Sequence, residues 1–294
     1  MRRLVYLLVF VLILTGCTFS TDDENKSLVE TPTLVTGENL ATNVENKTEV
    51  KIETMEDLLE VTIDFALTST ICVKNYQTII TKVVGGSFFR PTYEEKEEHG
   101  LYGTGSGVIY YKALTVEGSY LYKVITNEHV VSVDSSVNVK AGEEEYKIYD
   151  EAYDEEITAK LIGKDSEADI AVLEFVSKRE YNAVTFAKKE DIKVGNYVIA
   201  VGTPIDIEFY NTCTYGIVSR IKETYIQHDA AINSGNSGWP LFNNYGKLIG
   251  INNSKLSGST STGVSIEGIY FAIPIDVVAE TVKEITGLDE IIYA

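Results

Sequence analysis

The sequence contains the octapeptide Asn233-Ser234-Gly235-Asn236-Ser237-Gly238-Trp239-Pro240, in which Ser237 lies between two glycines and ahead of apolar residues. Two interpretations of this stretch are open. It can be a tight turn that leads into a strand, because Gly and Asn tolerate positive φ. It can also be a strained turn that presents Ser237 as a nucleophile, with backbone N–H groups turned towards its oxygen. The motif Gly-x-Ser-Gly is too short to decide between these interpretations, so the decision rests on the rest of the chain.

Short runs rich in Val, Ile and Tyr make up most of the chain from about residue 70 to 273. Gly, Asn, Asp or Glu separate them, a pattern typical of strands. The predicted strands are 70–76, 106–111, 119–126, 137–140, 157–162, 170–175, 197–201, 214–221, 224–229, 247–252 and 268–273. Because no long helical periods lie between them, antiparallel sheets closed into barrels or sandwiches are favoured. The strands are too many for one small barrel, so we expect an all-β fold of two antiparallel β-barrels, at roughly 68–180 and 181–275.

Two helices are expected to flank these strands. Thr54 and Asp57 fit an N-cap and its acidic partner at the start of a helix over 54–67. Asp276 fits the N-cap of a C-terminal helix that runs to about Thr286 and that Gly287 would end. The apolar residues at helical spacing are Met55, Leu58, Leu59, Ile63 and Ala66 in the first helix, and Val278, Val282 and Ile285 in the second.

One acidic segment interrupts the strand pattern. Residues 85–102 begin with two glycines, and their charged side chains include Glu94, Glu95, Glu97, Glu98 and His99. We expect a solvated, mobile loop here. A metal site is not expected, because no second cluster of ligands has suitable spacing.

Composition limits the partners of the chain. The 294 residues are 44% apolar and carry a formal net charge of −19. Such a surface repels phosphate backbones, so nucleic acid is not an expected partner. We expect no cofactor. Cys72 and Cys213 each lie in an apolar, strand-like run, where a disulfide and a buried free thiol are both open, since pairing cannot be read from sequence.

The first residues have the pattern of an export signal. Arg2 and Arg3 precede an apolar run, 4–14, that is too short to span a bilayer comfortably as a helix. The following Leu14-Thr15-Gly16-Cys17 resembles the lipobox of bacterial lipoproteins, although an ordinary secretion signal with a chance cysteine is the alternative. The resemblance implies a signal peptide over 1–16 and lipidation of Cys17, which would anchor the chain on the extracytoplasmic face of the bacterial cell membrane. Residues 17–50 are polar and read as a flexible tether before a folded domain at 51–294.

A nucleophilic serine needs a general base within hydrogen-bond reach, and the base needs an orienting acceptor. The chain has three histidines: His99 in the acidic segment, His228 at a strand end, and His129 after the apolar run Val124-Ile125-Thr126. A histidine in the place of His129 either faces a cleft or is a satisfied core imidazole. Asp169 opens the apolar run Ile170-Ala171-Val172-Leu173, so it either caps its own backbone or pairs with a buried group.

Several motifs together resemble the HtrA/Deg branch of the trypsin-like serine proteases, over about residues 68–280. In chain order they are Gly103-Thr104-Gly105-Ser106-Gly107-Val108-Ile109, Ile125-Thr126-Asn127-Glu128-His129-Val130-Val131, Ala168-Asp169-Ile170-Ala171-Val172-Leu173, Tyr215-Gly216-Ile217-Val218-Ser219, Asp229-Ala230-Ala231-Ile232-Asn233-Ser234-Gly235-Asn236-Ser237-Gly238 and Phe271-Ala272-Ile273-Pro274. The resemblance implies a double β-barrel with the site between the barrels. It also implies the catalytic order His, Asp, Ser, which this chain has.

The resemblance assigns a role to each catalytic residue. Ser237 Oγ would attack the scissile carbonyl, His129 would take its proton, and Asp169 would accept from the other ring nitrogen. The backbone N–H groups of Gly235 and Ser237 would form the oxyanion hole.

The same resemblance implies how substrate would bind. Ala231, followed by Ile232, would lie at the base of the S1 pocket, where the absence of a carboxylate favours small or medium aliphatic P1 residues. Asn252, Asn253 and Ser254 match the strand that pairs with substrate backbone, so unfolded or extended polypeptides are the expected substrates. Resembled proteases are often trimers, and a homo-trimer is one expectation here.

Departures from the family pattern leave other functions open. Trp239 replaces the usual glycine, Ser234 replaces the usual proline, and about twenty residues follow Pro274, too few for the family's C-terminal PDZ domain. The leading hypothesis is a membrane-tethered endoprotease of the cell envelope that cleaves misfolded or exported proteins. One alternative is a catalytically silent protease-like binding or chaperone lipoprotein. Another is a glutamyl-specific endopeptidase with His228 in its pocket, although a surface position is favoured for His228.

Overall fold

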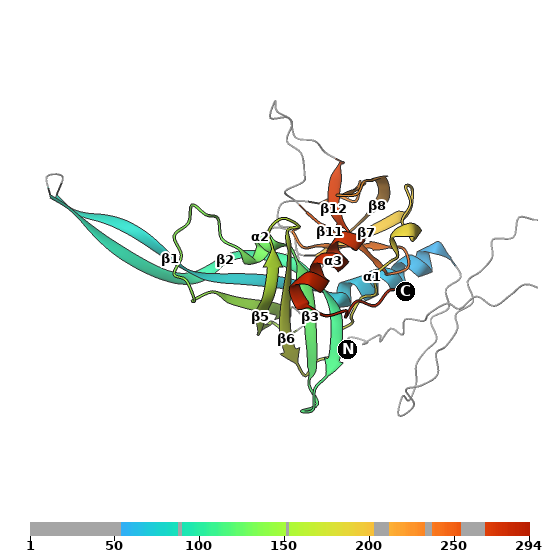
Figure 1. The fold of residues 1–294 in the computed structure, drawn as a ribbon, viewed down its shortest axis with the longest axis horizontal. Helices are drawn as coiled ribbons and strands as arrows, with labels where there is room; N and C mark the ends of the chain where they lie inside the picture. The colour runs from blue at the N-terminus through green and yellow to red at the C-terminus, as the bar shows by residue number, and fades with distance from the viewer. Residues whose placement is uncertain (1–53, 88–89, 151–152, 203–211, 233–236, 254–267) are drawn as a thin grey trace, which may run out of the picture. The chain divides into compact units, whose positions relative to one another are not determined.

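The computed structural model describes residues 54–87, 90–150, 153–202, 212–232, 237–253 and 268–294, and the chain from Thr54 to Ala294 is one compact unit. In these ranges the strands form two closed antiparallel barrels, as the sequence predicted (Figure 1). The first has the order β1-β2-β3-β6-β5-β4. Its strands are β1 (Thr70–Ser87), β2 (Arg90–Leu114), β3 (Tyr120–Thr126), β4 (Glu145–Asp150), β5 (Glu155–Asp165) and β6 (Ile170–Ser177).

The second barrel has the order β10-β11-β12-β9-β8-β7. Its strands are β7 (Tyr197–Gly202), β8 (Thr212–Ile221), β9 (Ile226–His228), β10 (Pro240–Asn243), β11 (Leu248–Asn252) and β12 (Tyr270–Pro274). A short 3-10 helix, η1 (Lys189–Asp191), precedes β7. Each barrel encloses its own apolar core: Val124, Ile148 and Leu173 are fully buried in the first, and Val198 and Leu241 in the second. Burial of these side chains is the main force that closes each sheet on itself.

Two helices flank the barrels and a third, short one carries part of the site. α1 (Met55–Ser69) has the predicted capping box, in which the Asp57 N–H donates to Thr54 Oγ1 and the Thr54 N–H donates to Asp57 Oδ2. α3 (Ile275–Thr286) contacts β5 and β6 of the first barrel and β11 and β12 of the second. α2 (Glu128–Val131) is a single turn between β3 and β4. Among the described residues, no helix has the length and apolar character needed to cross a membrane.

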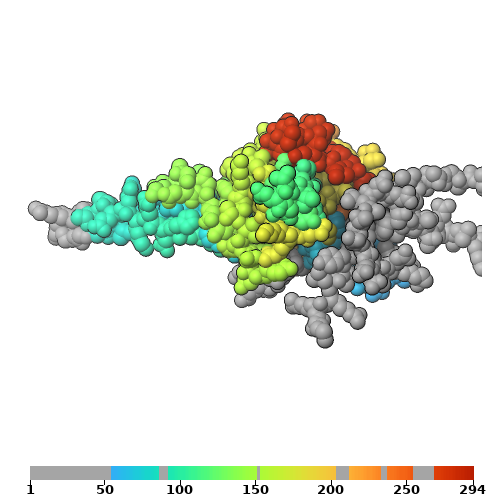
Figure 2. Space-filling view, turned by 90° about the horizontal axis from the view of Figure 1, so that it is seen from below, coloured from blue at the N-terminus to red at the C-terminus, as the bar shows by residue number. Residues whose placement is uncertain are grey.

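The acidic segment 85–102, predicted as a mobile loop, instead belongs to two paired strands in its described part: 85–87 end β1 and 90–102 begin β2. β2 pairs with β1 continuously from Thr70↔Val108 to Ser87↔Arg90, with one register shift at Asn75/Tyr76. The hairpin extends beyond the barrel wall in both views (Figures 1 and 2). The prediction was wrong because it considered only the charges of 94–98 and not the residues of β1 with which they pair. Those side chains are exposed, whereas their backbone groups bond to the β-branched run of β1, which suits a strand.

Smaller corrections concern two strands and a cap. The strand predicted at 137–140 is absent: Val139 makes one isolated bridge to Ile79, and the barrel strand is β4, whose few apolar residues alternate with charges. β10 was not predicted, because four residues directly after a turn give no pattern. Asp276 is not the N-cap of α3, which is Pro274; the Asp276 carboxylate pairs with Lys189 instead. Gly287 does end the helix, in the left-handed conformation at φ 68°.

The two cysteines are free thiols in different barrels. Cys72 is buried in β1 and Cys213 is half-buried in β8. Burial raises the pKa of the Cys72 thiol to about 12 and that of Cys213 to about 11, so both are protonated near neutral pH. Within the described ranges, no three His, Cys, Asp or Glu side chains are grouped so as to hold a metal ion.

Candidate active site

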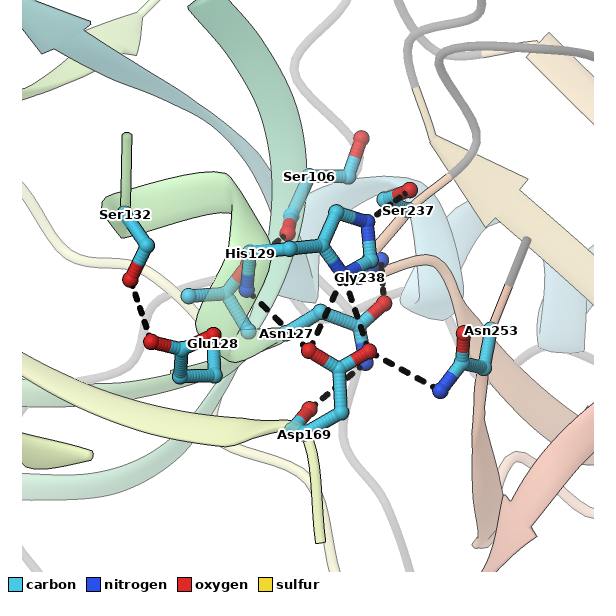
Figure 3. Close-up of polar contacts among 10 residues, drawn as sticks. Ser106, Asn127, Glu128, His129, Ser132, Asp169, Ser237, Gly238 and Asn253 are labelled. Atoms are coloured by element: carbon cyan, nitrogen blue, oxygen red, sulfur yellow. Dashed lines mark hydrogen bonds and ion pairs between the residues drawn. The ribbon is translucent and has the colours of Figure 1, made fainter. Parts of the chain in front are cut away.

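The residues predicted as a catalytic triad meet where the two barrels face each other (Figure 3). His129 lies on α2, directly after β3, and Asp169 lies in the turn before β6. Ser237 lies in the turn before β10 of the second barrel. The structure therefore brings together three side chains that are far apart in the sequence.

Their polar atoms form one continuous chain of contacts. His129 Nε2 is 2.5 Å from Ser237 Oγ. On the other side of the ring, His129 Nδ1 is 2.9 Å from Asp169 Oδ1 and 2.8 Å from Oδ2. A carboxylate only accepts, so Nδ1 carries the proton and Nε2 presents its lone pair to the Ser237 hydroxyl. This is the arrangement in which an imidazole can take a proton from a serine.

Asp169 is held from several directions. Its backbone is left-handed at φ 55°, which is uncommon for a residue other than glycine. The backbone N–H of His129 donates to its Oδ1 at 3.1 Å, and Asn253 Nδ2 donates to its Oδ2 at 2.9 Å. Only 8% of the Asp169 side chain is exposed, against 23% for His129. The site is therefore closed around the carboxylate and more open around the imidazole.

The turn after the serine depends on glycine. Gly238 has φ 81°, and a Cβ there would lie 1.9 Å from the carbonyl oxygen of Ser106. Ser106, on β2, also donates its N–H to the Ser237 carbonyl at 2.9 Å. A Cβ on Gly105 would meet the Val130 side chain at 2.6 Å, so this glycine lets α2 approach β2. The motif Gly105-Ser106-Gly107 thus positions the turn and the helix that carry Ser237 and His129.

Trp239, the departure from the family pattern, has a pocket of its own. Its side chain is fully buried in the core of the second barrel. A Cβ on Gly202 would lie 2.2 Å from the indole, so the ring occupies the space beside a residue without a side chain. The Trp239 carbonyl accepts from the N–H of Asn252 at 2.8 Å and from its Nδ2 at 3.0 Å. The bulky residue is therefore accommodated within the core of the second barrel.

His228 is fully buried, so the predicted surface position was wrong. Its Nε2 lies 2.7 Å from Asn252 Oδ1. Because Asn252 Nδ2 already donates to Trp239, Oδ1 is the acceptor and His228 Nε2 is the donor. Burial lowers the pKa of His228 to about 4, so the ring is neutral near neutral pH. The burial of His228 could not be predicted, because a polar residue at a strand end is as common on the surface as in the interior.

The predicted substrate-binding residues have different surroundings. Ala231 is exposed, and Ile232 is half-buried against the core of the second barrel. Asn252 and Asn253 are buried, and the Asn253 N–H donates to the Phe271 carbonyl at 3.0 Å. Their side chains bond within the protein, to His228, Trp239 and Asp169, a use that sequence reasoning missed. Predictions made for Cys17, Ser234, Gly235 and Ser254 lie outside the described residues.

Asn127 is a further site residue that sequence reasoning missed. It directly follows β3, within the motif that contains His129. Its fully buried amide touches both the Asp169 backbone and the turn after Ser237. One signal was available in the sequence: Asn127 lies between a buried strand and the candidate base. A polar side chain there is expected to be buried, so it needs hydrogen-bond partners within the protein.

Comparison with known proteins identifies related peptidases. Residues 105–251 match the model of the trypsin-like peptidase domain. The chain is 37% identical over 218 residues to the serine protease Do-like HtrA of Bacillus subtilis, covering 70% of this chain and 44% of that protein. It is 39% identical over 194 residues to the same-named protein of Lactobacillus helveticus, covering 63% and 43%. A probable periplasmic serine endoprotease DegP-like of Rhizobium meliloti is 39% identical over 177 residues, covering 58% and 31%. The chain thus spans less than half the length of these relatives.

Proposed function

This chain belongs to the family of trypsin-like peptidases, in its HtrA/Deg-like branch, and we propose that it is a serine endopeptidase that uses Ser237, His129 and Asp169. The observation that carries the proposal is the unbroken contact from Ser237 Oγ through the imidazole to the Asp169 carboxylate. Such a chain of contacts is needed to make a serine hydroxyl nucleophilic near neutral pH.

The reaction would follow two acyl-transfer steps. Ser237 Oγ attacks the scissile carbonyl while His129 Nε2 takes its proton, and Asp169 stabilises the resulting imidazolium. His129 then donates the proton to the leaving amine, which leaves an acyl group on Ser237. A water molecule, deprotonated by the same nitrogen, hydrolyses the ester and restores the serine. We assign the oxyanion hole to the backbone N–H groups of Gly235 and Ser237, where one such donor is typically worth about 2.7–4 kcal/mol.

The proposed substrates are extended or misfolded polypeptides cleaved after small or medium aliphatic residues. The apolar pair Ala231 and Ile232 has no carboxylate with which to bind a basic P1 side chain. The contacts of His228 argue against the glutamyl-specific alternative. That ring is buried, uncharged near neutral pH and bonded to Asn252, so it has no positive charge to offer a glutamate. Sequencing the cleavage sites in unfolded casein tests this, since cuts mainly after Glu contradict it.

The proposed location is the cell envelope. The lipobox resemblance supports an anchor on Cys17 at the extracytoplasmic face of the membrane, with 17–50 as a tether. Relatives named as periplasmic are consistent with export. Labelling cells with a radioactive fatty acid tests the anchor, because a Cys17→Ser variant should take up no label. A homo-trimer is proposed from the family alone, and sedimentation of the soluble domain tests it.

Labelling with a fluorophosphonate probe tests the catalytic proposal. The wild-type domain should be labelled, and Ser237→Ala, whose folding should be unchanged, should not. A folded wild-type domain that is never labelled supports the alternative of a silent binding or chaperone protein. The burial of Trp239 against Gly202 favours the active enzyme, because the core of the second barrel accommodates the indole.

A further inference from the structure

The amide of Asn127 connects the two backbone turns that carry Asp169 and Ser237. Asn127 is fully buried between β3 and α2. Its Nδ2 donates to the Asp169 carbonyl at 2.9 Å, and its Oδ1 accepts from the Gly238 N–H at 2.7 Å (Figure 3). One contact needs a donor and the other an acceptor, so both ends of the amide are fixed.

Both turns contain a residue in the left-handed backbone conformation, which needs support from surrounding contacts. Asp169 has φ 55° and Gly238 has φ 81°, both in the left-handed region. A rotation of either peptide would move the neighbouring catalytic atom: the carboxylate in one case and the Ser237 hydroxyl in the other. His129 is only two residues from Asn127 along the chain. One side chain therefore contacts the turns that carry Asp169 and Ser237, and it lies two residues before His129 in the chain.

Asn127 joins two turns that other contacts also support. The Ser106 N–H donates to the Ser237 carbonyl at 2.9 Å. From the second barrel, Asn253 Nδ2 donates to the Asp169 carboxylate at 2.9 Å. Asn127 belongs to the first barrel, and its Oδ1 accepts from Gly238 in the turn that leads into β10 of the second. Its amide therefore connects the barrel that carries the base with the turn that carries the nucleophile.

We infer that Asn127 is a positioning residue for the reaction: it sets the His129–Ser237 distance by holding the Asp169 and Gly238 backbones at once. The inference rests on the proposed function. It predicts an effect on the chemical step and not on substrate binding, because the amide is buried and faces no substrate. A misplacement of about 1 Å can lower a rate by about 10²-fold.

The experiment compares Asn127→Ala with Thr62→Val, a control of similar burial. Thr62 lies on α1, where its hydroxyl donates to the Asn244 carbonyl at 3.0 Å, a contact that involves no triad residue. Both variants remove a hydrogen bond made by a buried side chain, and both should melt at a lower temperature. In cleavage of fluorescent casein, Asn127→Ala should lower kcat by about 10²-fold with KM within about twofold, whereas Thr62→Val should change neither by more than about twofold. Equal kcat values in the two variants would overturn the inference.

A second measurement does not depend on activity. Amide hydrogen exchange should show Gly238 protected in the wild type and in Thr62→Val, and at least about tenfold less protected in Asn127→Ala. Unchanged protection overturns the inference. Asn127→Asp keeps an acceptor for Gly238 but removes the donor to Asp169, so it should retain the protection while losing kcat. If no fluorophosphonate labels the wild type, the proposed function fails. The role of Asn127 is then still tested, because hydrogen exchange reports its contact with the Gly238 N–H directly.

Discussion

The indole of Trp239 fills the space that Gly202 leaves open in the wall of the second barrel. A Cβ on Gly202 would lie 2.2 Å from the ring, and Trp239 itself is fully buried. Gly202 is the last residue of β7, and Trp239 directly precedes β10, which pairs with β7. A large side chain directly after the Ser237-Gly238 turn is therefore compatible with that turn only because position 202 has no side chain.

This relationship predicts strong coupling between the two positions. Gly202→Ala should destabilise the domain by about 1–3 kcal/mol through overpacking, and Trp239→Ala by about 3–5 kcal/mol through the cavity it leaves. In the Trp239→Ala background the added methyl group has room, so Gly202→Ala should cost at least about 1 kcal/mol less. Urea unfolding of the four proteins measures the cycle. Simple additivity would mean that the indole does not occupy this space.

The fold was predictable because its cores have a clear pattern. Runs such as Ile170-Ala171-Val172-Leu173 are apolar throughout, and these are strands buried on both sides. Where a strand has few apolar residues, as in β4, prediction failed. Register and partner cannot be read from a single run, so the pairing of 90–102 with β1 was invisible.

The candidate catalytic residues could be predicted from the sequence, but the residues that position them could not. A serine nucleophile needs a base and an acceptor, which limits the residue types, and the resemblance of the surrounding motifs to a protease family then picked out His129, Asp169 and Ser237 as candidates. Asn127 and Asn253 were given no positioning role, because an asparagine serves as donor or acceptor in many settings and only three-dimensional proximity assigns its partners. The pocket of Trp239 was likewise hidden, since nothing in the sequence links it to Gly202.

The outer half of the β1–β2 hairpin should be dispensable for folding and for labelling. Side chains at 81–85 and 92–99 are exposed and belong to neither barrel core. Replacing 82–95 with Asn-Gly would join Thr81 and Lys96, which are paired neighbours, through a two-residue turn. The melting temperature should change by less than about 4 °C, equivalent to about 1 kcal/mol, and the fluorophosphonate labelling rate should be unchanged. A large loss of either would show that the hairpin supports the barrels or the site.

Loss of the Asn253 amide should impair catalysis through Asp169. In Asn253→Ala the buried carboxylate loses the donor at 2.9 Å from its Oδ2. A hydrogen bond to a charged group contributes about 1.5–3 kcal/mol, so kcat/KM should fall about tenfold to 100-fold. The labelling rate should fall in parallel, because the same imidazole activates Ser237 in both reactions. Casein cleavage and probe labelling, each compared with Thr62→Val, check this, and a normal labelling rate would contradict it.

Buried His228 should make the stability of the domain depend on pH. Burial lowers its pKa from the usual 6.5 to about 4 in the folded protein, so between these values the unfolded chain binds more protons than the folded one. Stability must then fall as the pH is lowered through this window, by about 2 kcal/mol between pH 7 and pH 5 for this group alone. His228→Gln keeps a donor for Asn252 but cannot titrate, so its free energy of unfolding should lose that part of the decline. Urea unfolding of both proteins at several pH values measures the difference, and parallel curves would mean that His228 titrates in the folded state as it does in the unfolded chain.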